Sequence, residues 1–430
     1  MKDKLKLSVR NFRAIEQADI LLNGVTVVSG INGCGKSTLS KLLYGVFRTV
    51  ETFEKAVTKE WYYNLEWVFR LMRNISSENR RAFIPPLRAG VGLEEMAESL
   101  RRGFALVRQE IENQKAESLV RDKIIEIFPK TANINLETLS LENLLDKILV
   151  EIDKQTENSK LRLRNRDLSI LFAELSQLFE ENLPFENCDL YELDNPIFNR
   201  QNNSMVEPLL ITKAIYIDTP MIVGYNNTFE NRLPLEYWRH LNSLLCSKRG
   251  DRVQSDELIE WITQEILHGE ITVKKDISRD LVFTPEGADK GYKLQDCATG
   301  VKSIASLLLL LKNGHLDDTT LLIIDEPEVH LHPEWIVEYA RFLVLMNKKI
   351  GVKLFIASHD PDMIAAIAGI AEKEEIQQNV NFYLASPNES VPPRYFYTGL
   401  KMKTGPIFKS FNKSIIKIEQ YSSDGIDDDE

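Results

Sequence analysis

The sequence predicts an α/β fold, in which a mostly parallel, doubly wound sheet is flanked by helices and interrupted by one large α-helical insertion. After residue 320, apolar strands at 321–324 and 353–357 alternate with helical stretches at 333–347 and 362–370. This β-α-β-α order is typical of a parallel sheet. From about 42 to 210 the apolar spacing is helical instead, with little strand signal.

One stretch near the N-terminus carries the strongest chemical signal. Residues 30–38 read Gly-Ile-Asn-Gly-Cys-Gly-Lys-Ser-Thr and fit the phosphate-binding pattern G-x-x-x-x-G-K-[ST] at every fixed position. The buried strand 25–28 precedes this loop and a helix begins near Lys36, which is the context that the pattern requires. A glycine-rich turn before an ordinary helix is the alternative, and the strand and helix together count against it.

The glycines of this phosphate loop let successive backbone N–H groups point inward and form a nest for phosphate oxygens. The helix adds the positive end of its dipole. Lys36 would reach the β- and γ-phosphates, and the Ser37 hydroxyl would bind Mg²⁺. The sequence therefore predicts a nucleoside-triphosphate site formed by Gly30, Ile31, Asn32, Gly33, Cys34, Gly35, Lys36, Ser37 and Thr38.

Two further strands, 5–9 and 18–22, are predicted to lead into the strand before this loop. The turn between them, residues 11–15, would lie near the nucleotide if the strands pair. Arg13 in this turn would either help to hold the nucleotide or remain a solvated arginine, and the sequence favours neither.

The helical insertion is expected to form a packed lobe. Heptads do not persist over three or four repeats, which argues against a long coiled-coil arm. A basic cluster in its last helix would either contact phosphate backbones or form a solvated helix face, which we favour. The candidate helices are 48–74, 92–128, 136–154 and 160–182, the breaks are Pro85-Pro86 and 182–203, and the basic cluster is Lys160, Arg162, Arg164 and Arg166.

Paired carboxylates follow the strand 321–324. Because ligands bind at the carboxyl ends of parallel strands, Asp325 and Glu326 would lie beside the phosphate loop. Asp325 would orient Mg²⁺ and its waters, and Glu326 would be the general base that polarises the attacking water. Adjacent acids in a helix cap are the alternative, which the apolar run before them disfavours.

Three histidines follow these strands. His359 comes directly after the strand 353–357 and would point into the same crevice, where it would bind the γ-phosphate and sense its loss. Its alternative role is to cap the next helix. His330 and His332 have the spacing of a metal pair, but no cysteine or further histidine lies nearby, so we expect them to shape a loop at a subunit contact instead of binding zinc.

Composition and charge indicate which partners and which cellular compartment to expect. The formal net charge of −11 argues against a broad basic surface for nucleic acid. The four cysteines are far apart, which suits a reducing compartment. The N-terminus has no apolar signal segment, and no apolar run approaches the length of a membrane span. We therefore expect a cytoplasmic protein with no membrane domain.

Together these motifs resemble those of the ABC/SMC-type P-loop ATPases. Residues 30–38 look like Walker A, 321–326 like Walker B with its catalytic glutamate, and Ser358-His359 like the switch histidine. Residues 298–302, Ala-Thr-Gly-Val-Lys, look like a degenerate signature motif. The string Asp-Glu-Pro-Glu-Val-His-Leu-His-Pro at 325–333 resembles the stand-alone bacterial AAA family ATPases related to RecF and to the ATPase half of OLD-family proteins.

The resemblance implies an ABC-type ATPase core divided by the insertion. Residues 1–45 and 213–411 would form the core, 46–212 the helical lobe, and 412–430 a C-terminal segment with an acidic tail. It also implies a head-to-tail homodimer with two ATP molecules at the interface, where each phosphate loop faces the partner's Thr299 and Gly300.

Two departures from the family pattern indicate slow turnover. Ala298 stands where the signature serine is usual, and no clear Q-loop glutamine is present, because Asp218-Thr219 occupies its place. If the dimer forms, Cys34 and the partner's Cys297 lie on either side of one triphosphate, and mild oxidation without nucleotide is predicted to cross-link them. The alternative is that both are small buried fillers.

The expected function is that of a slow ATPase that dimerises around ATP and Mg²⁺. Dimerisation would act on the helical lobe and on a separately encoded effector, such as a nuclease, in bacterial anti-phage defence. The alternative is a RecF- or SMC-like ATPase in DNA repair or maintenance that closes on duplex DNA, which would need a basic groove and salt-sensitive binding.

Overall fold

The computed structural model describes residues 5–75, 92–113, 117–127, 139–181, 187–224, 233–249, 255–274, 280–329, 331–391 and 393–423. The chain divides into two compact units. Unit 1 comprises Met1–Glu51, Phe172–Phe198 and Val206–Glu430, and unit 2 comprises Thr52–Leu171 and Asn199–Met205. Residues 172–198, which the sequence places in the helical lobe, therefore group with the unit that contains the phosphate loop.

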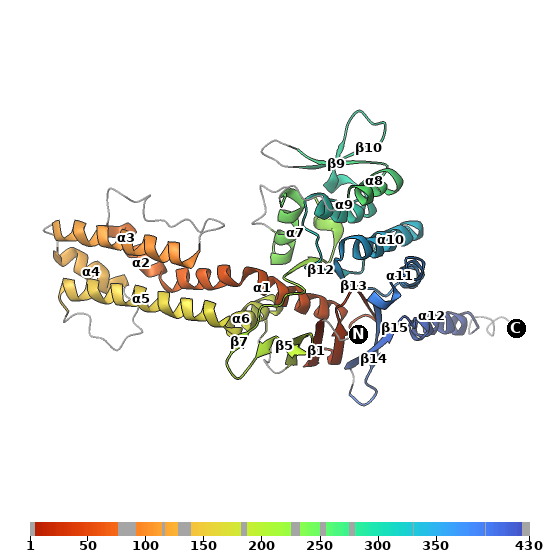
Figure 1. Ribbon diagram of the computed structural model, residues 1–430, viewed down its shortest axis with the longest axis horizontal. Helices are drawn as coiled ribbons and strands as arrows, with labels where there is room; N and C mark the ends of the chain where they lie inside the picture. The colour runs from red at the N-terminus through yellow and green to blue at the C-terminus, as the bar shows by residue number, and fades with distance from the viewer. Residues whose placement is uncertain are drawn as a thin grey trace. The chain divides into compact units, whose positions relative to one another are not determined.

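Unit 1 is built on a ten-stranded sheet. Its strands are β1 (Leu5–Phe12), β2 (Ile15–Leu21), β3 (Val25–Ser29), β4 (Cys188–Glu192), β5 (Asn195–Pro196), β8 (Lys213–Ile217), β12 (Thr320–Asp325), β13 (Lys353–Ala357), β14 (Val380–Pro387) and β15 (Tyr395–Lys401). Their order is β5-β4-β1-β2-β15-β14-β3-β13-β12-β8. Of these strands, Figure 1 labels β1, β5, β12, β13, β14 and β15. Five of the nine pairings are parallel and four are antiparallel. The predicted α/β class is confirmed, and the sheet is mixed.

The parallel half of the sheet, β14-β3-β13-β12-β8, forms the centre of the core. Every residue of β3, β8 and β12 is buried. Helices cover such strands on both faces, so their sequences are apolar throughout instead of alternating. The helix α9 (Thr299–Lys312) contributes a continuous buried run from Lys302 to Leu311 to the same core.

The remaining elements of unit 1 surround this sheet. They are the helices α7 (Glu236–Cys246), α8 (Asp256–Trp261), α10 (Pro333–Ile350), α11 (Pro361–Lys373) and α12 (Gly405–Ser423), a π-helical turn at Ile262–Ile266, and a three-stranded sheet of β9 (Gly269–Val273), β10 (Leu281–Pro285) and β11 (Tyr292–Lys293). Two helices, α1 (Lys36–Asn64) and α6 (Leu168–Phe179), have residues in both units.

Two parts of the sheet differ from the sequence-based expectation. The range 182–203 was expected to be a break, but it contains β4, which pairs with β1 and extends the main sheet. No strand was expected after residue 357, whereas β14 and β15 form the middle of the sheet. Both carry aromatic and β-branched runs, including Phe382-Tyr383 and Tyr395-Phe396-Tyr397, and this is the ordinary signal for a strand.

Unit 2 is helical. It contains α2 (Glu66–Ile75), α3 (Leu93–Asn113), α4 (Glu117–Ile127) and α5 (Leu141–Asn165), together with the ends of α1 and α6, while a short pairing joins β6 (Phe198–Asn199) to β7 (Ser204–Met205). Ser140 caps α5 by accepting a hydrogen bond from the Asn143 N–H. The apolar side chains Leu144, Leu145, Ile148 and Ile152 of this helix are buried.

The basic cluster of α5 is used inside unit 2. Arg162 pairs with Glu60 at 2.6 Å and with Asp167 at 2.9 Å, and Lys160 pairs with Glu157 at 3.1 Å. These ion pairs support the structural interpretation of the cluster over a phosphate-binding one. The predicted break at Pro85-Pro86 and the acidic residues 427–430 lie outside the described residues.

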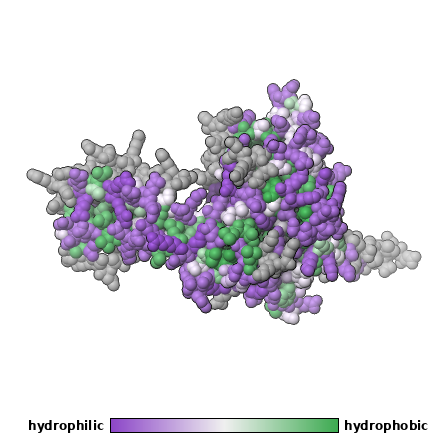
Figure 2. Space-filling view, in the orientation of Figure 1, coloured by the Kyte–Doolittle hydropathy of each residue, from purple (hydrophilic) through white to green (hydrophobic). Residues whose placement is uncertain are grey.

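Within the described part of the chain, no helix is long and apolar enough to span a bilayer. The described residues on the face drawn in Figure 2 are mostly hydrophilic, with apolar patches between them.

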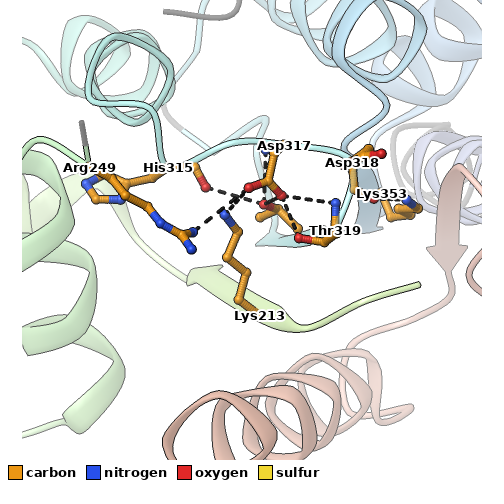
Figure 3. A network of polar contacts seen from close by, with 8 residues as sticks. Lys213, Arg249, His315, Asp317, Asp318, Thr319 and Lys353 are labelled. Atoms are coloured by element: carbon orange, nitrogen blue, oxygen red, sulfur yellow. Dashed lines mark hydrogen bonds and ion pairs between the residues drawn. The ribbon is translucent and has the colours of Figure 1, made fainter. Parts of the chain in front are cut away.

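A network of polar contacts lies at the amino ends of β8 and β12 (Figure 3). Lys213, at the start of β8, forms an ion pair with Asp317. The other Asp317 oxygen accepts hydrogen bonds from the Thr319 N–H at 3.0 Å and from the Thr319 and Thr320 hydroxyls at 2.8 Å. Arg249 lies 3.9 Å from the first oxygen. Each Asp317 oxygen is therefore satisfied.

Candidate nucleotide-binding site

Four neighbouring parallel strands of unit 1 end at one edge of the sheet. Val28 of β3 lies opposite Ala357 of β13, and Ala357 lies opposite Asp325 of β12. β8 runs beside β12 with Ile217 opposite Ile324. The segments that follow these strands therefore begin side by side, as expected for a ligand site at the carboxyl ends of parallel strands. We call this the phosphate edge.

A pocket of about 320 Å³ opens at the phosphate edge. Gly33 and Gly35 in its wall have φ angles of 81° and 100°, which residues with a side chain rarely adopt. A Cβ on Gly35 would lie 2.8 Å from Ile15, whereas the space beside Gly33 is open to 4 Å. The lining residues are Arg13, Ala14, Asn32, Gly33, Gly35, Lys36, Ser37, Thr38 and Glu326.

Lys36 is the buried cation of this pocket. The side chain is 6% exposed, and its ammonium donates hydrogen bonds to the Gly30 carbonyl at 2.8 Å and the Ile31 carbonyl at 3.3 Å. Among the described residues no carboxylate forms an ion pair with it. A buried charge without a counter-ion is costly, so the site fits an anionic ligand such as the phosphates of a nucleotide.

Three of the predicted loop residues do not line the pocket: Gly30, Ile31 and Cys34. The Cys34 thiol is fully buried, and its sulfur lies 3.8 Å from the Tyr397 hydroxyl, which donates a hydrogen bond to the Cys34 carbonyl. The structure thus agrees with the alternative that Cys34 is a small buried filler. The predicted cross-link to Cys297 is disfavoured, because it requires an accessible thiol.

Arg13 lies at the rim of the pocket and is anchored there. It donates hydrogen bonds to Glu181 at 2.6 Å and to the Phe179 carbonyl at 3.0 Å, and its guanidinium lies 4.8 Å from the centre of the Phe179 ring. The sequence left a solvated arginine and a nucleotide contact open. The structure places Arg13 on the pocket wall with its guanidinium paired to Glu181, and a contact with the nucleotide stays a prediction.

Asp325 is held on both carboxylate oxygens. Ser40 of α1 donates a hydrogen bond to Oδ1, and Tyr216 of β8 donates one to Oδ2 at 2.8 Å. Burial raises the pKa of Asp325, and the bonds from Ser40, Tyr216 and Ser37 oppose that rise. The Asp325 carboxylate and the exposed Ser37 hydroxyl are oxygen ligands of the kind that Mg²⁺ binds, because this ion takes few protein oxygens and keeps several waters.

The hydroxyls that hold Asp325 were not predicted from the sequence. Ser40 lies one helical turn after Ser37, so both face the same side of α1, and this spacing was the available signal. Tyr216 carries no comparable local signal, because only the parallel pairing of β8 with β12 brings it to Asp325.

Glu326 lines the pocket directly behind β12. Its φ angle is 47°, and its N–H donates a hydrogen bond to the Ala357 carbonyl at 2.7 Å, so the chain turns sharply as it leaves the sheet. The side chain is 40% exposed. The helix-cap alternative is wrong for these acids, because α10 begins only at Pro333 and its N-cap is His332.

His359 meets Glu326 at the same edge. Its Nδ1 lies 3.5 Å from Glu326 Oε1 and 3.4 Å from Glu328 Oε1. The N-cap of α11 is Asp360, which accepts a hydrogen bond from the Met363 N–H at 2.8 Å. His359 is therefore not the cap of the next helix. Glu328 had no role in the sequence-based prediction.

The predicted signature residues lie apart from this pocket. Thr299 and Gly300 begin α9, whose N-cap Ala298 makes no side-chain hydrogen bond. The Thr299 hydroxyl is exposed and lies 4.0 Å from the Met221 sulfur. Neither residue lines the pocket.

Neither Asp218 nor His332 lines the pocket. Asp218, which follows β8, accepts a hydrogen bond from the Trp238 indole at 2.7 Å, and burial raises its pKa. His332 is 70% exposed, and His330 lies outside the described residues. Within the described part of the chain, no group of three or more histidine, cysteine or acidic side chains is placed to hold a metal ion.

Comparisons with known proteins address the family. The family model described as "AAA domain, putative AbiEii toxin, Type IV TA system" matches residues 25–365, which is more than half of the chain. No curated protein sequence matches.

Three solved structures illustrate the structural similarity. They are an SMC head bound to the C-winged helix domain of ScpA (TM-score 0.40, 10% identity, 94% of this chain and 98% of that chain), the SMC head domain from Thermotoga maritima (0.34, 10%, 92% and 99%) and cbiO1 from Clostridium perfringens, part of an ABC transporter complex (0.33, 12%, 98% and 100%). Because these scores are low, the assignment rests on the family match. The chain belongs to the AAA domain family described above, and the predicted resemblance to ABC/SMC-type P-loop ATPases is confirmed.

Proposed function

We propose that the protein binds ATP with Mg²⁺ at the phosphate edge and hydrolyses it. The observation that carries the proposal is the pocket that a buried, uncompensated Lys36 and Glu326 line together, with His359 Nδ1 3.5 Å from Glu326 Oε1. Each of these groups comes from a different segment of the chain. Their meeting depends on the parallel strand order and not on local sequence.

Each side chain has a distinct role in this proposal. Lys36 binds the β- and γ-phosphates, and Glu326 takes a proton from the attacking water as general base. His359 contacts the γ-phosphate. A bound Mg²⁺, held through Ser37 and Asp325, would neutralise charge on the phosphates.

The same proposal includes a homodimer. Thr299 and Gly300 lie outside the pocket, as expected if they complete the site of a second copy. The uncapped start of α9 leaves backbone N–H groups for an anion. With Ala298 in place of the signature serine, we expect turnover to be slow.

A separately encoded protein effector is the proposed partner, in anti-phage defence. The family description names a toxin of a toxin–antitoxin system, which is a two-protein arrangement, and this supports a protein partner. The net charge of −11 and the ion pairs of Arg162 and Lys160 favour a protein over DNA. Stimulation of turnover by duplex DNA that disappears with salt would instead support the DNA-repair alternative.

The direct test is the substitution Glu326→Gln. The amide keeps the shape of the side chain but removes the base, so turnover should fall by about 10²–10⁴ while ATP binding is retained. Without hydrolysis, the ATP-bound dimer should accumulate, which size-exclusion chromatography with light scattering would detect. Glu334→Gln is the matched control, since that side chain is 88% exposed and does not line the pocket. Full turnover in Glu326→Gln would contradict the proposal.

A further inference from the structure

We propose that Glu328 is a positioning residue for the ATPase site, and that it presents Nε2 of His359 to the phosphate by holding the backbone and the Nδ1 side of that histidine. The inference rests on the proposed function and adds a second glutamate to it. Glu328 touches neither the pocket nor Asp325 in the described contacts, so its action would pass through His359.

The first support is the set of contacts made by one carboxylate oxygen. Glu328 Oε1 accepts hydrogen bonds from the Ser358 hydroxyl at 2.9 Å and from the His359 N–H at 3.1 Å, and it lies 3.4 Å from His359 Nδ1. One atom thus accepts hydrogen bonds from the side chain before the histidine and from the histidine backbone. It lies close to Nδ1, which is buried and has no hydrogen-bond partner among the described residues. This arrangement ties the end of β13 to the turn that follows β12.

The second support is the condition of the other oxygen. Glu328 Oε2 is buried and has no hydrogen-bond partner among the described residues, and the side chain is only 6% exposed. Burial accordingly raises the pKa of Glu328, although the bonds from the His359 N–H and the Ser358 hydroxyl oppose the rise. Leaving a buried carboxylate oxygen unpaired costs stability. A buried polar atom of this kind calls for an explanation, and the position of Glu328 against His359 offers one.

The third support is the competition between two carboxylates for the same ring nitrogen. Glu326 lies 3.5 Å from Nδ1 and Glu328 lies 3.4 Å from it. To act on a water, Glu326 must turn away from the imidazole. Glu328 would then accept a hydrogen bond from Nδ1, which has no hydrogen-bond partner in the described part of the chain, so that the ring holds its orientation and tautomer. Carboxylates fix histidine tautomers in this way in other kinds of sites.

The local fold explains why Glu328 reaches the histidine. Glu326 has a positive φ angle, and the Val329 N–H bonds back to the Glu326 carbonyl at 3.0 Å. This tight turn directs Glu328 back toward β13 while Glu326 stays on the pocket wall. Two glutamates separated by one proline therefore occupy different environments.

The first test is a double-mutant cycle on ATP turnover. Glu328→Gln should lower kcat by about tenfold, the lower end of the effects seen for residues that orient a functional group, with little change in ATP affinity. In a His359→Ala background the same substitution should have no further effect, because its target is absent. A merely structural role would give additive losses, and that result would overturn the inference. Glu334→Gln again serves as the control.

The second test does not depend on turnover. With nitrogen-15-labelled histidine, NMR shifts should assign the proton to Nδ1 of His359 in the unmodified protein and show a changed or mixed tautomer in Glu328→Gln. The signal is identified by its loss in His359→Ala. Glu328→Asp, which withdraws the carboxylate by one methylene, should also change the His359 signal. Identical His359 signals in the unmodified protein, Glu328→Gln and Glu328→Asp would overturn the inference.

The two tests also separate this inference from the proposed function. Turnover that is absent, or that does not depend on Glu326, would contradict the ATPase proposal while the NMR result still decides whether Glu328 holds His359. Because Gln removes a buried charge, the Tm of Glu328→Gln should be unchanged or higher, and a large loss of Tm would count for a structural role.

Discussion

The two ends of the same parallel strands are built differently. At the amino ends of β8 and β12, Lys213 and Asp317 are paired, and each Asp317 oxygen has a partner (Figure 3). At the phosphate edge, Lys36 has no carboxylate partner among the described residues, and the unpaired buried atoms there include Glu328 Oε2 and the Ser29 hydroxyl oxygen. Six residues of β12 separate the two environments.

The difference indicates that the amino ends serve stability and the phosphate edge serves binding. Saturated polar groups stabilise a fold, whereas unsaturated ones persist where a ligand or a moving group completes them. Substitutions at the two ends should therefore separate into losses of Tm and losses of nucleotide chemistry.

The largest effect on nucleotide binding is expected for Lys36→Ala. Removal of a buried ammonium that would donate charge-assisted hydrogen bonds should weaken ATP binding by about 10–100-fold. The Tm without nucleotide should change little, since Lys36 bonds only to neutral carbonyl groups. Titration with a fluorescent ATP analogue measures the first effect and thermal unfolding measures the second. Lys41→Ala, on the same helix and outside the pocket lining, is the control, and equal affinity in both variants would count against the assignment of the loop.

The opposite pattern is expected for Lys213→Met at the amino ends. The substitution removes one partner of a largely buried ion pair, which should cost about 1–3 kcal/mol of unfolding free energy and lower the Tm by several degrees. ATP turnover at a temperature well below the Tm should be unchanged. Lys353→Met is the control, because this more exposed lysine donates a hydrogen bond to the Asp318 carbonyl in the same network (Figure 3). A loss of turnover in Lys213→Met but not in Lys353→Met would contradict the assignment of the amino ends to stability alone.

A smaller effect is expected for Tyr216→Phe, which joins the two regions through β8. Loss of the hydroxyl frees one oxygen of Asp325, so the carboxylate is less well oriented for Mg²⁺. The Mg²⁺ concentration that supports half-maximal nucleotide binding should rise by about tenfold. A Mg²⁺ titration at fixed nucleotide analogue measures this midpoint. An unchanged midpoint would show that Tyr216 does not position Asp325 for the metal.

The smallest effect is a pH dependence of stability. Burial alone would raise the pKa of Asp317, but hydrogen bonds from Lys213, Thr319 and Thr320 lower it from 3.8 to about 2. A depressed folded-state pKa stabilises the protein above pH 3.8, and the stabilisation is lost as the pH falls toward 2. The Tm difference between the unmodified protein and Asp317→Asn should therefore be constant near neutrality and shrink below about pH 4. A Tm difference that grows on acidification would contradict a lowered pKa of Asp317 in the folded protein.

The sequence predicts the site better than it predicts the sheet. The phosphate loop, Asp325-Glu326 and His359 follow apolar strands with recognisable motifs, and parallel pairing then brings them together. β14 and β15 were missed, although they form the middle of the sheet and supply Tyr397 beneath the loop. Tyr216 and Glu328 support the site through contacts between distant segments, which no local pattern encodes. Ser40 had a local signal in its spacing from Ser37.

The most direct measurement compares Glu326→Gln with Asp317→Asn, with ATP turnover and Tm determined on the same preparations. We expect the turnover of Glu326→Gln to fall by about 10²–10⁴-fold while its Tm stays the same. We expect the Tm of Asp317→Asn to fall by several degrees while its turnover stays the same. If both variants lost both turnover and Tm, or if Glu326→Gln kept full turnover, the result would contradict the claim that the amino ends serve stability and the phosphate edge serves nucleotide chemistry.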